Sequence, residues 1–149
     1  MIHLLLTLSF IGSVLTRQLT DDLPLQDTGT IIIELETLKN HDGVLLVSLF
    51  SDKEGFPDEW EKAFRSEIVP ITEELREIRL EDIPHGTYSL AIVHDENENM
   101  KLDTNFFGVP KEGYGFSNNV RGRFGPPKFS DALFTFDSDT YTHRIRLNY

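Results

Sequence analysis

Six short segments of the chain have the hydrophobic pattern of β-strands, in which successive side chains point to opposite faces. They are residues 30–38, 43–50, 75–80, 86–93, 132–136 and 141–147. In the first of them, Ile31, Ile33 and Leu35 share one face, and two glutamates share the other. Residues 43–50 are apolar on both faces, which predicts a central strand that is covered on both sides.

One helix is predicted between the second and third of these segments. Residues 57–61 read Pro-Asp-Glu-Trp-Glu, which offers Asp58 as the N-cap residue with Glu61 three positions later. Trp60 and Phe64 are four residues apart, so we expect them to share the buried face of this helix.

The links between the predicted strands are rich in turn-forming residues. Residues 137–140, Asp-Ser-Asp-Thr, predict a hairpin turn between the last two strands. Residues 97–130 have little strand periodicity and are crowded with Gly, Asn, Pro and aromatic residues, which predicts a long ordered Gly/aromatic loop. Together these features favour an all-β fold, an antiparallel β-sandwich with one short helix.

The amino-terminal segment predicts export. Residues 1–16 carry no Asp, Glu, Lys or Arg, and their apolar run has the length of a signal-peptide core. The alternatives are an apolar first strand and an uncleaved anchor. We expect residues 17–29 to be a linker and residues 30–149 to form the domain, with no transmembrane segment in the mature chain and a periplasmic or secreted location.

Charge and cysteine content exclude several functions. The 149 residues include 25 acidic and 14 basic ones, a formal net charge of −11 that argues against binding to nucleic acid. Cysteine is absent, so disulfides, thiolate zinc sites and cysteine nucleophiles are excluded. The length is that of one domain.

A polar turn predicted at residues 95–103 has the composition of a calcium loop. Side-chain oxygens recur at positions 1, 3, 5 and 9, with a main-chain carbonyl at position 7, and hard cations prefer such oxygen ligands. The metal-ligand candidates are Asp95, Asn97, Asn99, Lys101 (through its carbonyl) and Asp103. Glu112 or Asp131 is a further candidate to complete the shell. The alternative is a metal-free turn in which Asp and Asn bond their own backbone.

The Gly/aromatic loop is a candidate contact surface for a sugar, a peptide or an anion. Glycines permit close approach of the backbone, and aromatic rings offer faces for stacking. The candidate ligand-binding residues are Tyr114, Phe116, Asn118, Asn119, Arg121, Arg123 and Phe124. The alternative is a loop packed on itself, with its aromatic rings buried and its arginines paired.

The run from His94 to Phe134, together with residues 49–64 and 83–95, resembles the DUF2141 family. The resemblance rests on the dense pattern D-x-N-x-N-x-K-L-D-T-N-F-F-G-x-P-x-x-G-Y-G-F-S-N-N. It implies an exported bacterial-type β-sandwich of the transthyretin-like or immunoglobulin-like kind, and it implies no reaction. Members of this family typically have Gly where Glu98 and Met100 stand here.

Two hypotheses of function follow. The first is an exported, non-enzymatic binding or structural module. Calcium stabilises it if residues 95–103 form a calcium loop, and not if they form a metal-free turn. It uses the Gly/aromatic loop as its contact surface, and a carbohydrate, a peptide or an envelope protein is its expected partner. No catalytic residue is assigned. The second hypothesis is a small extracytoplasmic hydrolase with a polar centre of four residues, namely His94, Asp103, Asn118 and Arg121.

Overall fold

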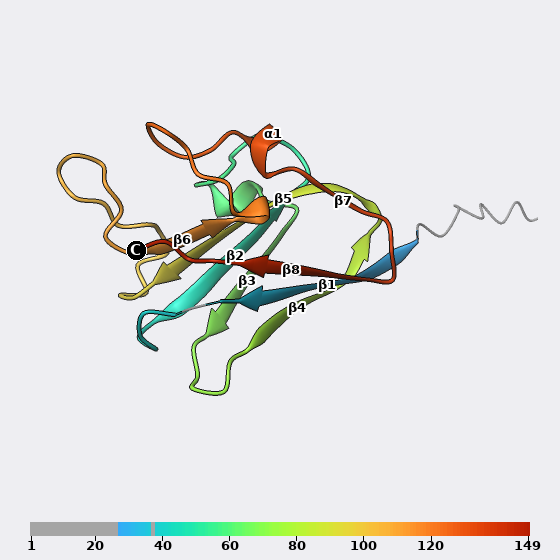
Figure 1. Ribbon diagram of the computed structural model, residues 1–149, viewed down its shortest axis with the longest axis horizontal. Coiled ribbons are helices and arrows are strands. Elements are labelled where there is room, and N and C mark those ends of the chain that lie inside the picture. Colours follow the sequence, from blue (N-terminus) through green and yellow to red (C-terminus); the bar gives the residue numbers. More distant parts are fainter. Residues whose placement is uncertain (1–26, 37) are drawn as a thin grey trace, which may run out of the picture.

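A computed structural model describes residues 27–36 and 38–149, which fold into two β-sheets packed face to face (Figure 1). The predicted signal peptide and most of the predicted linker lie outside these residues. The strands are β1 (Thr28–Leu35), β2 (Val44–Phe50), β3 (Arg65–Pro70), β4 (Glu77–Pro84), β5 (Gly86–Asp95), β6 (Gly113–Phe116), β7 (Phe134–Phe136) and β8 (Thr140–Ile145). Three short helical turns join them, namely η1 (Trp60–Lys62), η2 (Ser117–Asn119) and α1 (Phe129–Ala132).

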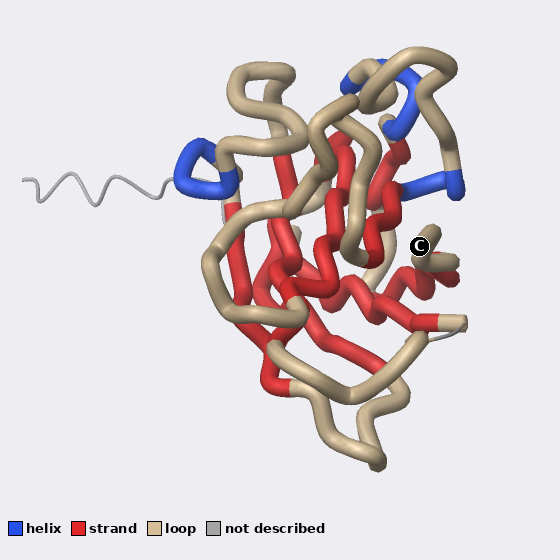
Figure 2. Tube along the Cα trace, turned by 90° about the vertical axis from the view of Figure 1, so that its left-hand side faces the viewer, coloured by secondary structure: helices blue, strands red, loops and turns tan. Residues whose placement is uncertain are grey.

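The sheet order confirms an all-β sandwich. One sheet has the order β4-β1-β8, and the other has the order β3-β2-β5-β6, with β7 pairing with β5. All pairs are antiparallel except β1 and β8, which run parallel with Ile33 opposite His143. Loops project beyond both ends of the strands (Figure 2). The described residues contain no helix long and apolar enough to cross a membrane.

The main core lies between the sheets and follows the alternation in the sequence. Ile31 and Ile33 are fully buried, as predicted, and so is Ile92 on β5. On β4, Ile78 and Leu80 are buried while the residues between and before them are exposed. The prediction that β2 is a central strand covered on both faces is confirmed, because it lies between β3 and β5 and six of its seven residues are buried.

A second, smaller core covers part of the outer face of the five-stranded sheet. Its buried members are Phe50, Ala91, Phe116 and Ala132. Phe56 lies over them with its ring centroid 5.4 Å from that of Phe50, in an edge-to-face arrangement. This cluster holds the segment before η1 and the segment around α1 against the sheet, so both positions are fixed by apolar packing.

Three predictions about local structure are wrong. The helix expected at Asp58 is only a 3-10 turn, its N-cap is Glu59, and no side chain caps it. Trp60 and Phe64 do not share a buried face, since η1 has no buried residue and Phe64 is 48% exposed. Residues 137–140 do not form a hairpin, because β7 pairs with β5 and β8 pairs with β1.

Two strands were missed by sequence reasoning. β3 follows η1 and has a mixed composition without clean alternation. β6 lies inside the predicted Gly/aromatic loop, where two of its four residues are glycine. Gly113 and Gly115 are needed there for close packing, because a Cβ on Gly113 would lie 2.4 Å from the ring of Tyr149. Strand β1 begins at Thr28, two residues inside the predicted linker.

Candidate functional site

The polar turn at residues 95–103 begins on a buried carboxylate. Asp95 is the last residue of β5 and is fully buried. Its two carboxylate oxygens accept hydrogen bonds from the backbone N–H groups of Asn99 (3.1 Å) and Met100 (2.7 Å). Both oxygens are therefore used in folding the chain back on itself.

Two asparagines complete the turn. The side-chain oxygens of Asn97 and Asn99 accept the backbone N–H groups of Asn99 and Lys101, at 3.1 Å each. Their amide groups donate to the carboxylate of Asp103 at 2.8 Å and 3.1 Å. These two donors, first Asn99 and then Asn97, lower the pKa of Asp103.

Glu112, the residue directly before β6, closes the turn. It is 4% exposed, and its two oxygens accept the backbone N–H groups of Glu96 (3.0 Å) and Asp103 (2.8 Å). Of the two residues expected as extra ligands, Glu112 therefore lies at the turn. Asp131 does not, because its carboxylate accepts the backbone N–H of Lys128 at the start of α1.

As the side chains lie, the turn is held by its own hydrogen bonds, and a calcium ion would require the amide groups of Asn97 and Asn99 to turn away from Asp103. The oxygens of Asp95, Asn97 and Asn99 all accept N–H groups, and two amide groups point at Asp103, where a cation would be repelled. Among the described residues, no group of three or more His, Cys, Asp or Glu side chains could hold a metal. The hydrogen bonds are those of the metal-free alternative.

Two residues of this turn adopt a backbone conformation that glycine prefers. Glu98 has a φ angle of 59° and Met100 has one of 67°. These are the two positions where members of the resembled family typically have glycine. A Cβ in the left-handed region costs roughly 1–2 kcal/mol, so the turn keeps its shape here against a steric penalty.

The predicted contact surface is divided between buried and exposed residues. Phe116 is buried in the second core, and Tyr114 is half-buried beside it on β6, with ring centroids 5.8 Å apart. Arg121 and Arg123 are exposed, and Phe124 is completely exposed. The self-packed alternative is thus correct for the strand and wrong for the loop that follows it.

The two predicted contact asparagines hold this loop in place. The Asn118 amide donates to the carbonyl of Leu133 (3.0 Å), and the Asn118 backbone N–H donates to Nε2 of His143 (2.8 Å). Asn119 bonds the main chain of β8 and the residues after it, donating to Arg144 and accepting from Arg146. Most of their hydrogen-bonding capacity serves the fold.

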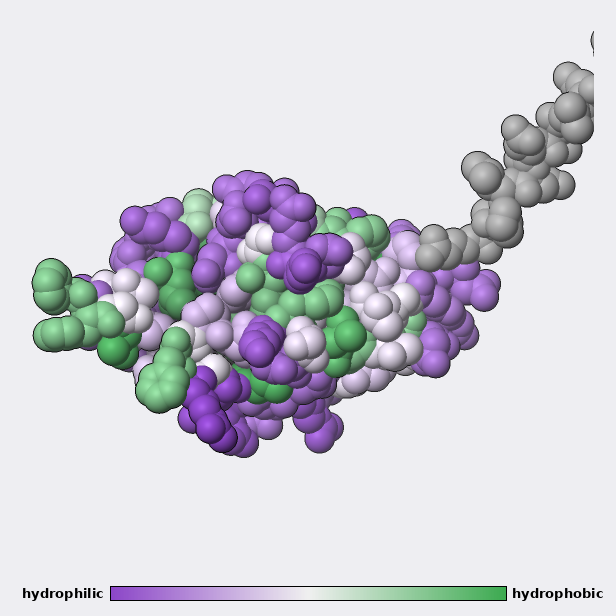
Figure 3. All heavy atoms as spheres, turned by 90° about the horizontal axis from the view of Figure 1, so that it is seen from above, coloured by the Kyte–Doolittle hydropathy of each residue, from purple (hydrophilic) through white to green (hydrophobic). Residues whose placement is uncertain are grey.

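A second exposed aromatic group lies on the loop before β6. Phe106 is 97% exposed, Phe107 is 85% exposed and Phe124 on the next loop is 102% exposed. We call residues 105–109 and 121–127 the aromatic loops. They project from the same end of the molecule, where Figure 3 shows apolar groups standing clear of the surface. The Phe-Phe-Gly sequence at 106–108 was the signal for this surface, and the predicted site omitted it.

Asn105 makes the first aromatic loop a closed turn. Its side-chain oxygen accepts the backbone N–H groups of Phe107 (2.8 Å) and Val109 (3.1 Å). Its backbone N–H donates to the carbonyl of Val109 at 2.8 Å. The backbone is bonded inward, and the phenyl rings are left on the outside.

The four residues of the hydrolase hypothesis are not brought together. His94 is fully buried, and its ring nitrogens bond the hydroxyl of Tyr149 (2.7 Å) and the carbonyl of Asp42 (2.8 Å), with no carboxylate partner. His94 pairs with Gly113 at the start of β6, whereas Asn118 lies beyond the other end of that strand. Asp103 is engaged by the amides of the turn.

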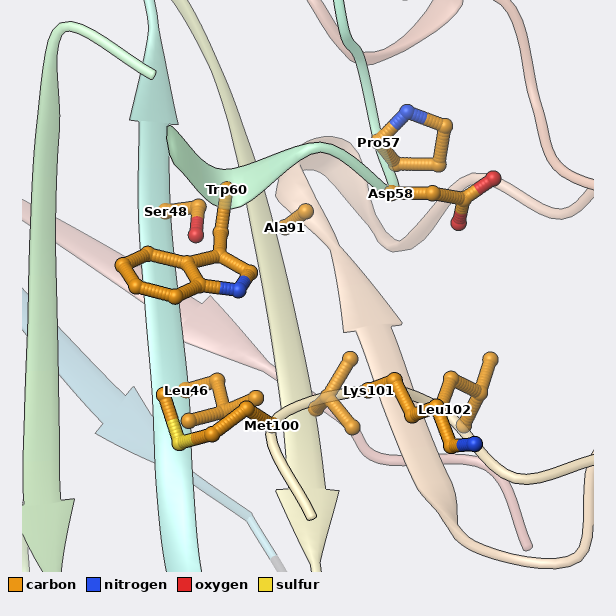
Figure 4. A pocket seen from close by; sticks show the side chains of 10 residues that line it. Leu46, Ser48, Pro57, Asp58, Trp60, Ala91, Met100, Lys101 and Leu102 are labelled. Atoms are coloured by element: carbon orange, nitrogen blue, oxygen red, sulfur yellow. The ribbon is translucent and has the colours of Figure 1, made fainter. Parts of the chain in front are cut away.

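A cavity of about 140 Å³ lies between the polar turn and η1, on the outer face of the five-stranded sheet (Figure 4). Trp60 forms one of its walls. Sequence reasoning placed this tryptophan on the buried face of a helix, so the cavity was missed. Only the fold of residues 51–64 across β2 and β5 brings its lining together.

The comparisons with known proteins identify a family and nothing more specific. The family model described as an uncharacterized protein conserved in bacteria, DUF2141, matches residues 33–144. No curated protein and no solved structure matches the chain. The match covers both sheets from the middle of β1 to the end of β8, including the polar turn and both aromatic loops.

Proposed function

Because the chain belongs to the DUF2141 family, whose description supplies no activity, we propose that it is an exported, non-enzymatic binding module. It docks onto a protein of the cell envelope through the aromatic loops. The observation that carries this proposal is the exposure of Phe106, Phe107 and Phe124.

Three exposed phenyl rings on a domain of this size are unfavourable in isolation. Burying a Phe side chain contributes about 1.5–3 kcal/mol, and these three contribute almost none of that to folding. Aromatic residues and arginine are enriched in the cores of protein–protein interfaces, and Arg121 and Arg123 directly precede the third ring. Burying these rings against a partner would therefore stabilise a complex, since the rings are not buried in the fold.

The charge around the rings indicates the kind of partner. Residues 104–128 contain Lys111, Arg121, Arg123 and Lys128, and their only acidic residue is Glu112, which is buried. None of these four cations forms an ion pair within the described residues. This end is locally positive in a chain of net charge −11. A complementary partner has an apolar cleft with an acidic rim.

The loops are ordered before binding, which lowers the entropic cost of association. The first is closed by Asn105, and the second is tied to the sandwich through Asn118 and Asn119. The backbone that carries the rings therefore loses little further freedom when a partner covers them.

Site-specific crosslinking tests the proposal, because the chain has no cysteine. A Val109→Cys variant carries a photoreactive crosslinker in the living cell, since Val109 is 54% exposed beside the rings. We expect one dominant protein adduct that disappears when Phe106, Phe107 and Phe124 are all changed to Ser. The adduct should persist in Ile68→Ser, which removes a half-exposed apolar side chain from the edge strand β3.

Two results would contradict the docking proposal. One is an adduct pattern that the triple Phe→Ser variant leaves unchanged. The other is an adduct with a second copy of this chain or with lipid in place of an envelope protein. Export is tested separately by mass spectrometry of the purified protein, for which we expect an amino terminus at Arg17 after removal of residues 1–16.

Calcium at the polar turn is a separate proposal that the docking function does not require. It rests on the many side-chain oxygens of residues 95–103, and it requires Asn97 and Asn99 to turn their amide oxygens toward Asp103. Melting in EDTA and then in millimolar Ca²⁺ tests it. A bound ion predicts a rise of several degrees that Asp103→Ala abolishes and that Mg²⁺ does not reproduce. An equal Tm in both conditions excludes it.

A further inference from the structure

The cavity near Trp60 has a floor made by the outer face of the five-stranded sheet. Leu46 and Ser48 of β2 and Ala91 and Val93 of β5 line it. Their neighbours Leu45, Val47 and Ile92 point the other way, into the main core. The strand alternation therefore supplies a flat floor that is apolar except for the Ser48 hydroxyl.

Two segments far apart in the sequence form the walls. Pro57, Asp58 and Trp60 belong to the segment that leads into η1, and Met100, Lys101 and Leu102 belong to the polar turn. Figure 4 shows Trp60 above the gap and Met100 below it, with Asp58 and Lys101 at opposite rims. A molecule in the gap would contact both walls and the floor at once.

Several polar groups of this cavity have no partner in the protein. The Ser48 hydroxyl belongs to a residue that is only 4% exposed, and it makes no hydrogen bond within the described residues. The indole N–H of Trp60, a partly buried residue, also makes no hydrogen bond within the described residues, and Figure 4 shows it turned toward the middle of the gap. Both groups are therefore available to bond a molecule in the cavity.

The charged residues at the rims are also unpaired. Neither Asp58 nor Lys101 forms an ion pair within the described residues. Loss of hydration and, less strongly, repulsion from Glu59 raise the pKa of Asp58, so its carboxylate favours a hydrogen-bond donor beside it. Since the two rims carry opposite charges, a ligand with a net charge is repelled by one of them.

Met100 links this cavity to the unusual backbone of the turn. Its φ angle of 67° is one that glycine adopts at lower cost, yet its side chain forms the wall opposite Trp60. Strain that persists at such a position is often associated with function. A glycine there would relieve the backbone and open the cavity on one side.

From this lining, we infer that the cavity is a binding site for a single neutral sugar ring. The apolar face of a sugar ring fits against the indole of Trp60 and the side chain of Met100. Its hydroxyl groups can donate to Asp58 and accept from Lys101 and the Trp60 N–H, and they can do either with Ser48. A mainly apolar lining with a few converging polar groups is the usual composition of small-molecule sites.

The single tryptophan of the chain makes the test direct, because all indole fluorescence comes from this cavity wall. The full chain is titrated with glucose, galactose and N-acetylglucosamine, and with glycine and alanine as zwitterionic comparators. We expect a saturable change in emission with at least one of the sugars and none with the amino acids. Asp58→Asn should weaken that binding about tenfold, since the charged acceptor is replaced by a neutral amide oxygen.

A matched control and a second variant separate binding from folding. Glu61→Gln removes a neighbouring exposed charge that does not line the cavity, and it should leave the affinity unchanged. Met100→Gly should weaken sugar binding while leaving Tm equal or higher. If Met100 served the fold alone, Met100→Gly would not weaken sugar binding while leaving Tm equal or higher.

Three results would overturn the inference. They are the absence of a saturable change with any of the sugars, saturation by an amino acid instead, and equal affinities in the native chain and in Asp58→Asn. Because the aromatic loops lie outside this lining, none of these results bears on the docking proposal. Loss of the crosslinked adduct in the triple Phe→Ser variant likewise leaves the sugar site untouched.

Discussion

The polar turn and the aromatic loops belong to one irregular segment. In both, burial is the reverse of what the residue types lead one to expect. At the turn, the charged residue Asp95 is buried, and so is Glu112, which bonds the turn from outside it. In the loops, Phe106, Phe107 and Phe124 are almost completely exposed. Polar residues thus form the interior of this segment, and aromatic residues form part of its surface.

The difference follows from what each part must satisfy. A tight turn packed against the end of β5 has backbone N–H groups that are shielded from water, and carboxylates are strong acceptors for them. The aromatic loops stand out from the sandwich, and their phenyl rings are left exposed (Figures 1 and 3). The buried carboxylates at the turn stabilise the fold, and the exposed rings of the loops are available to contact a partner.

The largest effect is expected when the interior of the turn is broken. Glu112→Ala leaves the backbone N–H groups of Glu96 and Asp103 without acceptors. The free energy of unfolding should fall by about 2–4 kcal/mol, measured by urea denaturation. Glu61→Ala, an exposed glutamate with no hydrogen bond or ion pair within the described residues, is the control and should change it by less than about 0.5 kcal/mol. Equal effects of the two variants would mean that the buried carboxylate does not organise the turn.

A gain in stability is expected where the turn is strained. Glu98 is exposed and has a φ angle of 59°, so Glu98→Gly should raise the free energy of unfolding by up to about 1 kcal/mol. Glu98→Ala keeps the Cβ and should give no such gain. Urea denaturation of both variants compares them, and a loss of stability in Glu98→Gly would show that the left-handed conformation is not present in solution.

The anchor of the second aromatic loop should respond to pH. Burial lowers the pKa of His143, whose neutral Nε2 accepts the backbone N–H of Asn118. The unfolded chain therefore binds a proton at this residue before the folded chain does, and stability should fall as the pH drops below about 6.5. His143→Gln keeps an acceptor and removes the titration, so its unfolding free energy should vary less between pH 7 and pH 5.

His41→Gln is the control for that measurement, because His41 is an exposed histidine. Its pH dependence should match that of the native chain. A native chain whose stability is constant between pH 7 and pH 5 would contradict the role of His143.

The smallest effect on stability is expected at the aromatic loops. Changing Phe106, Phe107 and Phe124 to Ser removes side chains that bury almost nothing, so the free energy of unfolding should stay within about 0.5 kcal/mol of the native value. Thermal melting measures this directly. A loss of more than about 2 kcal/mol would mean that the rings are buried in solution, and it would remove the contrast with the turn.

The sequence predicted the parts of the fold that depend on local periodicity. Ile31 and Ile33 on β1, like Ile78 and Leu80 on β4, alternate with polar residues, and this pattern identified the face that the three-stranded sheet buries. The spacing of Asp and Asn in residues 95–103 located the polar turn, and the family resemblance located the two glycine-like positions at Glu98 and Met100. The helix at Asp58 failed because a capping pattern cannot sustain a helix whose next residues enter strand β3.

By itself, the sequence determined which residues alternate, where the polar turn at residues 95–103 forms and how much charge the chain carries, because these depend on neighbours along the chain. Only the tertiary structure decided the rest. It turned Phe116 inward and Phe124 outward, although each stands next to a glycine and they are only eight residues apart. It placed Glu112 behind the turn and brought Trp60 opposite Met100. These outcomes depend on which sheet face lies beneath each side chain, and that is fixed by pairing between distant strands.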